Sequence, residues 1–212
     1  MDNLKVSVIL PTFNRNYIVS RAIDSVLKQD FFNWELIIVD DGSTDDTRNK
    51  VASYRDERIK YFVIPHQGQS AARNFGIKNS SGELIAFLDS DDYYLPHHLS
   101  RAVKYFAENS ACDFWRGRVQ VLGERLVRDM ENLEDFIDVE ECHPQGTFVF
   151  RRSILAKIGL LPEVDYGEDY LFYNRAKENG LLVFDDIERT YIFDRTGENS
   201  VTKSFARQFK NN

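Results

Sequence analysis

Short apolar runs alternate with amphipathic segments over the first half of the chain. The amphipathic pattern is clearest between residues 18 and 27, where apolar side chains recur at helical spacing. The apolar runs have the length and β-branched content of buried strands, and they are KVSVIL at 5–10, WELIIVD at 34–40, IKYFVI at 59–64 and ELIAFLD at 83–89. Strands that alternate with helices build βαβ units, so the pattern predicts an α/β fold with a Rossmann-like, mostly parallel central sheet flanked by helices.

The pattern changes after about residue 110. A helix is predicted over 166–180, because polar and apolar residues recur at helical spacing and Gly180 supplies a typical helix end. An acidic stretch over 127–145 has no readable pattern. Four further runs predict strands, at 112–123, 146–151, 181–186 and 189–195.

Polar side chains follow three of the predicted strands at the point where each strand ends. The carboxyl ends of parallel strands meet at one edge of an open sheet, and ligands bind in the crevice outside that edge. Three polar strand ends at one edge favour a binding site over unrelated caps and turns. The residues are Thr12, Asn14 and Arg15 after the first strand, Asp40 and Asp41 after the second, and Asp89 to Asp92 after the fourth.

The stretch LIAFLDSDDYYLP at 84–96 places Asp89, Asp91 and Asp92 directly after a buried strand. Neighbouring carboxylates repel each other and burial increases the cost, so such a cluster needs a cation or strong hydrogen bonds to neutralise it. Carboxylate oxygens suit hard divalent cations such as Mg²⁺ and Mn²⁺. Asp92 either faces this site or only caps the next turn.

Composition limits the classes of protein that remain. The chain has 212 residues, of which 42% are hydrophobic, enough for a sizeable core. Its net charge of -7 argues against a nucleic-acid partner. Cys112 and Cys142 lie in no metal-ligand spacing, which favours a reducing compartment. Because no signal-peptide pattern and no apolar run of membrane-spanning length occur, we expect a cytoplasmic protein.

Four motifs occur in order along the chain: VSVILPTFNR, ELIIVDDGSTDDT, GQSAARNFGIKNSSGELIAFLDSDDYYLP and YGEDYLFYNRA. In this order and spacing they resemble the family 2 glycosyltransferases of the GT-A fold, and the resemblance covers residues 5 to about 180. The resemblance implies an inverting transfer of a sugar from a nucleotide-diphosphate sugar, with UDP-sugars favoured, to an acceptor hydroxyl. It implies help from Mn²⁺ or Mg²⁺, and a glycan or lipid-linked acceptor in polysaccharide or cell-envelope glycan synthesis.

The resemblance also assigns nucleotide-binding residues. Thr12 and Arg15 match the loop that flanks the nucleotide. Either Asp40 or Asp41 matches the acid that recognises the base, and Arg73 matches the arginine that lies near base or phosphate. Residue type alone allows a structural role for each of these residues instead. The two aspartates could be turn acids around a glycine, and Arg73 could belong to a surface ion pair.

The remaining assignments concern the chemistry. In the D-x-D element, Asp91 matches the metal ligand and Asp89 lies nearer the ribose. Asp169 matches the second residue of the family's "ED" pair, the general base, with Glu168 as its rival and a simple helix-start acid as the alternative. Charge that builds on the leaving diphosphate calls for a cation, and the attacking hydroxyl calls for a base on the opposite face of the sugar.

Histidines are the main departure from the family pattern. YIFDRTGENSVTK at 191–203 contains no histidine where many relatives have one, which leaves the third metal ligand open. We expect the His97–His98 pair to be solvated at a helix start, and His143 is a candidate for substrate contact because it lies in a loop.

We expect residues 1–110 to form the nucleotide-sugar-binding half and residues 111–202 the acceptor-binding half of one domain. Residues 203–212 form a basic tail with interleaved phenylalanines, which favours peripheral contact with the inner face of a membrane. Two other functions remain open from the residues: a catalytically silent nucleotide-sugar-binding module, and a metal-dependent phosphoryl-transfer or receiver-type domain.

Overall fold

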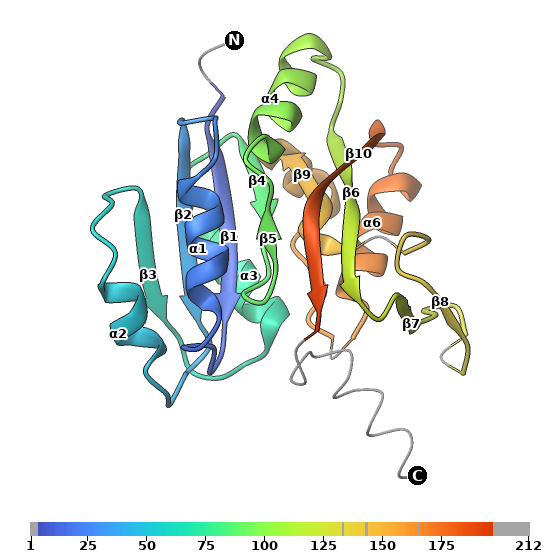
Figure 1. Cartoon of the computed structure of the whole chain (residues 1–212). Helices are drawn as coiled ribbons and strands as arrows, with labels where there is room; N and C mark the ends of the chain where they lie inside the picture. The colour runs from blue at the N-terminus through green and yellow to red at the C-terminus, as the bar shows by residue number, and fades with distance from the viewer. Residues whose placement is uncertain (1–3, 133, 143, 165, 197–212) are drawn as a thin grey trace.

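A central sheet with helices on both of its faces forms the body of the protein (Figure 1). The computed structural model describes residues 4–132, 134–142, 144–164 and 166–196. Within these ranges, eight strands pair in the order β3-β2-β1-β4-β9-β6-β10-β5. They are β1 (Val6–Thr12), β2 (Trp34–Asp40), β3 (Ile59–Val63), β4 (Leu84–Phe87), β5 (Tyr93–Tyr94), β6 (Phe114–Gly123), β9 (Phe148–Arg151) and β10 (Val183–Arg195).

Helices connect the strands of the first half and flank those of the second. They are α1 (Val19–Leu27), α2 (Thr47–Ala52), α3 (Gln69–Lys78), α4 (His98–Glu108), α5 (Leu155–Ile158) and α6 (Glu168–Glu178), with short 3₁₀ turns η1 (Gln145–Thr147) and η2 (Arg152–Ile154). None of the helices in the described ranges is long and apolar enough to span a membrane.

Strand directions confirm the predicted mostly parallel sheet. β1 runs parallel to β2 and β4, β2 to β3, and β6 to β10. β9 is antiparallel to both β4 and β6, and the two-residue β5 is antiparallel to β10. The sheet therefore contains a parallel half built from the first 90 residues, joined through β9 to a second half.

Two apolar layers cover the two faces of the sheet. Along β1, Val8 and Leu10 pack into one layer with α1 and α4, whereas Ile9 packs into the other with α3 and α6. This alternation follows from the two-residue period of a strand. Figure 1 shows α1 on one face and α3 and α6 on the other. Since β1, β2 and β4 are covered on both faces, they are mostly apolar, which is why the sequence shows nearly continuous apolar runs.

The carboxyl ends of β1, β2 and β4 lie at one edge of the sheet, as the sequence predicts. Thr12 is in register with Asp40, and the backbone N–H of Leu88 donates to the carbonyl of Ile9 at 3.0 Å. β9 runs antiparallel to β4, with Val149 opposite Ala86, so the residues that precede β9 reach the same edge.

The second half differs from the prediction in two places. The runs at 181–186 and 189–195 form one strand, β10, whose register with β6 shifts on both sides of Arg189. These irregularities explain why the sequence shows two strands. The unpatterned acidic stretch contains a small two-stranded sheet, β7 (Leu126–Arg128) and β8 (Phe136–Asp138), which is absent from the prediction.

Candidate active site

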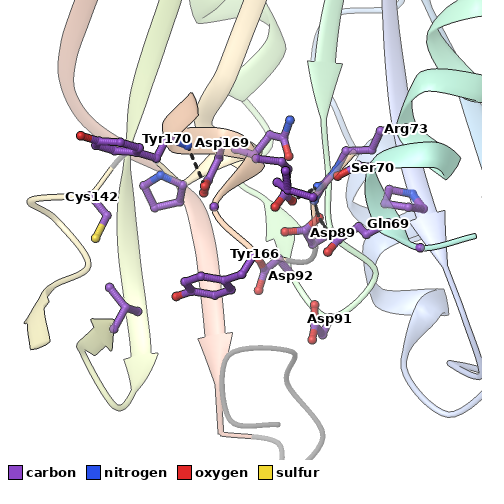
Figure 2. A pocket seen from close by; sticks show the side chains of 18 of the residues that line it. Gln69, Ser70, Arg73, Asp89, Asp91, Asp92, Cys142, Tyr166, Asp169 and Tyr170 are labelled. Atoms are coloured by element: carbon purple, nitrogen blue, oxygen red, sulfur yellow. Dashed lines mark hydrogen bonds and ion pairs between the residues drawn. The ribbon is translucent and has the colours of Figure 1, made fainter. Parts of the chain in front are cut away.

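A cavity of about 710 Å³ lies at the carboxyl edge of the sheet, with walls from both halves of the chain. Figure 2 shows Asp89, Asp91 and Asp92 on one side of it and Asp169, Tyr166 and Cys142 on the other. Seven of the eight predicted site residues line this cavity: Thr12, Arg15, Asp41, Arg73, Asp89, Asp91 and Asp169. Only Asp40 among the predicted residues does not.

Arg73 connects the two acidic motifs of the site. It lies on the buried face of α3 and is 1% exposed. Its guanidinium donates to Asp89 after β4 and, at 2.6 Å, to Glu168 Oε1 at the start of α6. The interpretation of Arg73 as a surface ion-pair partner is therefore wrong. Because it is buried between two carboxylates, Arg73 holds the D-x-D loop and the α6 terminus next to each other.

Asp92 anchors the D-x-D loop to the second half. The hydroxyl of Tyr191 and the backbone N–H of Asp194 both donate to its carboxylate, and only 1% of the residue is exposed. Burial, together with the charges of Asp91 and Asp89, raises the pKa of Asp92 well above its ordinary value. Asp92 thus lines the cavity and bonds to β10 instead of only capping the next turn.

Asp91 is the most weakly partnered carboxylate of the loop. Its Oδ2 lies 3.5 Å from Nη2 of Arg15, and its side chain keeps 25% of its exposure. Burial raises the pKa of Asp91, and the neighbouring Asp89 raises it further. A cation at this point would relieve the repulsion between the two carboxylates, so the residues present fit a hard divalent ion.

Among the described residues, Asp91 lacks the protein partners for a complete cation site. In the described part of the chain, no group of three or more His, Cys, Asp or Glu side chains is arranged to hold a metal ion. A cation here would therefore take its other ligands from a bound molecule and water, as Mg²⁺ sites commonly do.

Asp40 and Asp41 have different surroundings. Asp40 accepts hydrogen bonds from the Tyr61 hydroxyl and, at 2.7 Å, from the backbone N–H of Ser43. Asp41 accepts from the backbone N–H groups of Gln67 and Gly68 at 2.8 and 2.9 Å, and it lines the cavity. The geometry therefore favours Asp41 over Asp40 as the residue next to a ligand.

An aromatic pair borders the same part of the cavity. The rings of Phe13 and His66 stack at 4.2 Å between centroids, and His66 Nδ1 lies 2.8 Å from Asp41 Oδ2. Phe13 keeps 40% of its exposure, and both rings line the cavity. Sequence reasoning missed this pair, although Phe13 lies within the PTFNR motif. Beneath it, the buried Thr12 hydroxyl has no hydrogen-bond partner among the described residues.

Glu168 and Asp169 open α6 and point to different groups. Gly167 adopts a left-handed φ of 80° immediately before the helix, a conformation that favours glycine. Successive helical residues point about 100° apart. Glu168 pairs with Arg73, whereas Asp169 lines the cavity and its Oδ1 accepts from the backbone N–H of Tyr170 at 2.8 Å.

Asp169 has the proton affinity of a base that works near neutral pH. Burial and, next, the charge of Glu168 raise the pKa of Asp169 to about 7. A pKa near the working pH is what general base catalysis favours. Asp169 also lies in the first turn of α6, as a helix-start acid does.

The second-half wall contains residues that the sequence did not indicate. Cys142, Gln145, Tyr166 and Tyr170 line the cavity, and burial raises the pKa of Tyr166 to about 12. Two of them come from the acidic stretch that has no readable motif. The candidate residue His143 and the basic tail 203–212 both lie outside the described residues.

Comparisons with known proteins agree with this arrangement. The chain is 38% identical over 128 residues to the Escherichia coli UDP-Glc:alpha-D-GlcNAc-diphosphoundecaprenol beta-1,3-glucosyltransferase WfgD, covering 60% of this chain and 50% of that protein. It is 34% identical over 192 residues to the Campylobacter jejuni GalNAc(5)-diNAcBac-PP-undecaprenol beta-1,3-glucosyltransferase, covering 84% of this chain and 62% of that protein. The chain thus spans about half to three-fifths of these relatives' lengths.

A solved structure shows the same fold. S. aureus TarS 1–349 in complex with UDP-GlcNAc superposes with a TM-score of 0.78 at 25% identity, covering 93% of this chain and 60% of that one. The family model for glycosyl transferase family 2 matches residues 7–159, which include the D-x-D loop, Arg73 and the strand ends that line the cavity. The chain therefore belongs to glycosyl transferase family 2 and has the GT-A fold.

Proposed function

We propose that the protein is an inverting hexosyltransferase that moves a sugar from a UDP-sugar to an acceptor hydroxyl with the help of a divalent cation. One observation carries this proposal. A single cavity has the weakly partnered Asp91 on one wall and Asp169, whose pKa burial raises to about 7, on the other. The reaction needs these two groups on opposite sides of the sugar.

The nucleotide would lie against the ends of β1 and β2. Asp41 and the Thr12 hydroxyl, which has no partner among the described residues, offer hydrogen bonds to the base, and the exposed face of the Phe13–His66 pair offers a stacking surface. Arg15, which lines the same wall, supplies positive charge beside the diphosphate. Arg73 contributes indirectly. Its guanidinium forms an ion pair with Asp89 and so positions that carboxylate, which would lie next to the ribose.

Mn²⁺ or Mg²⁺ would be held by Asp91 and would neutralise charge on the leaving diphosphate. Asp169 would accept the proton of the attacking hydroxyl at its carboxylate, on the far side of the sugar. Arg73 and Asp92 keep the two walls in place through Glu168 and Tyr191. Attack from the side opposite the leaving group inverts the anomeric configuration.

The acceptor would enter from the second half of the domain, residues 111–202, while residues 1–110 bind the donor. The two relatives named above carry names that specify undecaprenol-linked sugars as acceptors, which supports a lipid-linked acceptor here. Peripheral contact with the inner face of a membrane is part of the same proposal. The phosphoryl-transfer alternative does not fit a chain of this family.

We expect UDP to stabilise the protein more with Mn²⁺ than with a chelator, because the cation links Asp91 to the diphosphate. A ligand at about one hundred times its Kd adds roughly 2.7 kcal/mol, which raises Tm by about 5–10 °C in a protein of this size. Thermal unfolding with UDP, GDP and inorganic phosphate measures this shift. Equal shifts with Mn²⁺ and with chelator would remove the cation from the mechanism.

The pH dependence of transfer should report Asp169. Since burial and Glu168 raise its pKa to about 7, the basic form is lost as the pH falls, and kcat/KM should rise through pH 7 to a plateau. Glu168→Gln removes a repelling charge, so its midpoint should move to lower pH. Initial rates between pH 5.5 and 8.5 provide the test, and a flat profile or a midpoint moved upward in Glu168→Gln would contradict it.

A further inference from the structure

Gln145 is buried with its polar atoms unused. The residue is 3% exposed, and neither its amide nitrogen nor its amide oxygen has a hydrogen-bond partner in the described part of the chain. A buried amide without partners is costly, and folded proteins rarely leave both of its atoms unpaired. Gln145 also lines the cavity. Because both amide atoms are themselves covered, a rotation of the side chain is needed to bring the amide to a ligand in the cavity.

A second buried glutamine shows how this fold satisfies such a group. Gln29 is also 3% exposed, and its amide nitrogen donates to the carbonyls of Ser25 and Leu95 at 3.0 and 2.8 Å. Its oxygen accepts from the backbone N–H of Leu99 at 3.0 Å. Gln29 thus makes its hydrogen bonds inside the protein, whereas Gln145 makes none with the residues that the structure describes.

Gln145 precedes a strand that borders the elements carrying both acidic motifs. It opens the turn η1 that leads into β9, and β9 is the antiparallel neighbour of β4, the strand that Asp89 and Asp91 follow. α6 packs on the same strand, with Tyr173 at 5.9 Å from Phe148 between ring centroids. The transferred sugar of the proposed reaction must occupy the space between Asp91 and Asp169.

The backbone beside Gln145 is fixed by a close contact. A Cβ atom at Gly146 would lie 2.0 Å from the ring of Tyr191, so only glycine fits there. Tyr191 is also the residue whose hydroxyl donates to Asp92 of the D-x-D loop. The position of Gln145 is thus tied to the loop that carries Asp91, whereas its terminal amide torsion is broad and can turn toward a ligand.

We propose that Gln145 binds hydroxyl groups of the donor's sugar ring and helps to select the sugar. An amide offers an N–H donor and a carbonyl acceptor side by side, which matches two neighbouring hydroxyls, one accepting and one donating. A site that hydrogen-bonds a substrate hydroxyl discriminates strongly against an analogue without it. This inference rests on the proposed function, because it requires a nucleotide-sugar in the cavity.

The test is Gln145→Met, which keeps an unbranched side chain of similar size without the amide, with Gln29→Met as the matched control. Dissociation constants for UDP and for UDP-glucose, UDP-galactose and UDP-N-acetylglucosamine are measured calorimetrically with Mn²⁺. We expect Gln145→Met to bind UDP as the wild type does, within about twofold, and to bind the preferred UDP-sugar about tenfold more weakly, the loss expected for two hydrogen bonds. Gln29→Met should leave the ratio of the two affinities unchanged.

Thermal unfolding of the ligand-free variants provides the second measurement. Gln145→Met should keep or raise the Tm, because it removes an unsatisfied buried amide, whereas Gln29→Met should lower it by several degrees. The inference is overturned if Gln145→Met lowers Tm as much as Gln29→Met does. It is also overturned if Gln145→Met weakens the binding of UDP and of the UDP-sugar by the same factor, or weakens the binding of neither. A wild type that binds no UDP or UDP-sugar would overturn the proposed function itself.

Discussion

Asp169→Asn should lower kcat by a factor of about 10²–10⁴, the loss expected when a general base is removed. The donor Kd should stay within about threefold of the wild-type value. Asparagine keeps the shape of the side chain but accepts no proton at neutral pH. The contacts that hold the donor are proposed at Thr12, Asp41 and Asp91, on the opposite wall of the cavity. The effect should therefore appear in the chemical step and not in binding.

Glu168→Gln is the matched control for this variant. Glu168 is adjacent and equally acidic, but its carboxylate is paired with Arg73 at 2.6 Å. We expect a smaller loss in kcat than for Asp169→Asn, together with some weakening of donor binding, because Arg73 also positions Asp89. If Glu168→Gln slows turnover more than Asp169→Asn does, the base has been assigned to the wrong residue.

Asp91→Asn should reduce transfer by at least about a hundredfold, the scale of lost charge stabilisation in the transition state. The amide keeps the shape of the side chain but not the negative charge that attracts the cation. The variant should also bind UDP almost equally with Mn²⁺ and with chelator. Steady-state rates at saturating donor measure the first effect, and titration of Mn²⁺ measures the second.

A variant at a surface aspartate tests whether the loss of transfer in Asp91→Asn is specific to Asp91 or follows from the loss of any acidic charge. Asp30 is exposed and does not line the cavity, so Asp30→Asn should transfer sugar at the wild-type rate. Turnover by Asp91→Asn close to that of Asp30→Asn would mean that the D-x-D assignment is wrong.

The parallel half of the fold and its strand ends were predictable from the sequence. β1, β2 and β4 are covered on both faces, so most of their residues are apolar, and the polar residues at and after their carboxyl ends mark the edge. The role of Arg73 was not predictable in this way. Its position on α3 is visible in the sequence, but its burial between Asp89 and Glu168 depends on how α6 packs, which no local pattern encodes.

The second half shows the same limit. Gln145 reaches the cavity from a segment that has no hydrophobic period, and its place follows from β9 entering the sheet next to β4. His98 is a clear error of local reasoning: it was expected to be solvated, yet it is fully buried and stacks on Tyr94 at 3.9 Å. Burial lowers the pKa of His98 to about 3, so it stays neutral. Tertiary packing overrides the preference of a helix start for polar residues.

The central claim is that cation-assisted binding of the donor's diphosphate and proton abstraction belong to opposite walls of one cavity. Calorimetric titration of a UDP-sugar, with Mn²⁺ present, into the wild type, Asp91→Asn and Asp169→Asn tests it most directly. The account predicts that Asp169→Asn binds the donor with the wild-type Kd while Asp91→Asn binds it far more weakly. Loss of donor binding in Asp169→Asn, or unchanged binding in Asp91→Asn, would contradict the division of roles between the two walls.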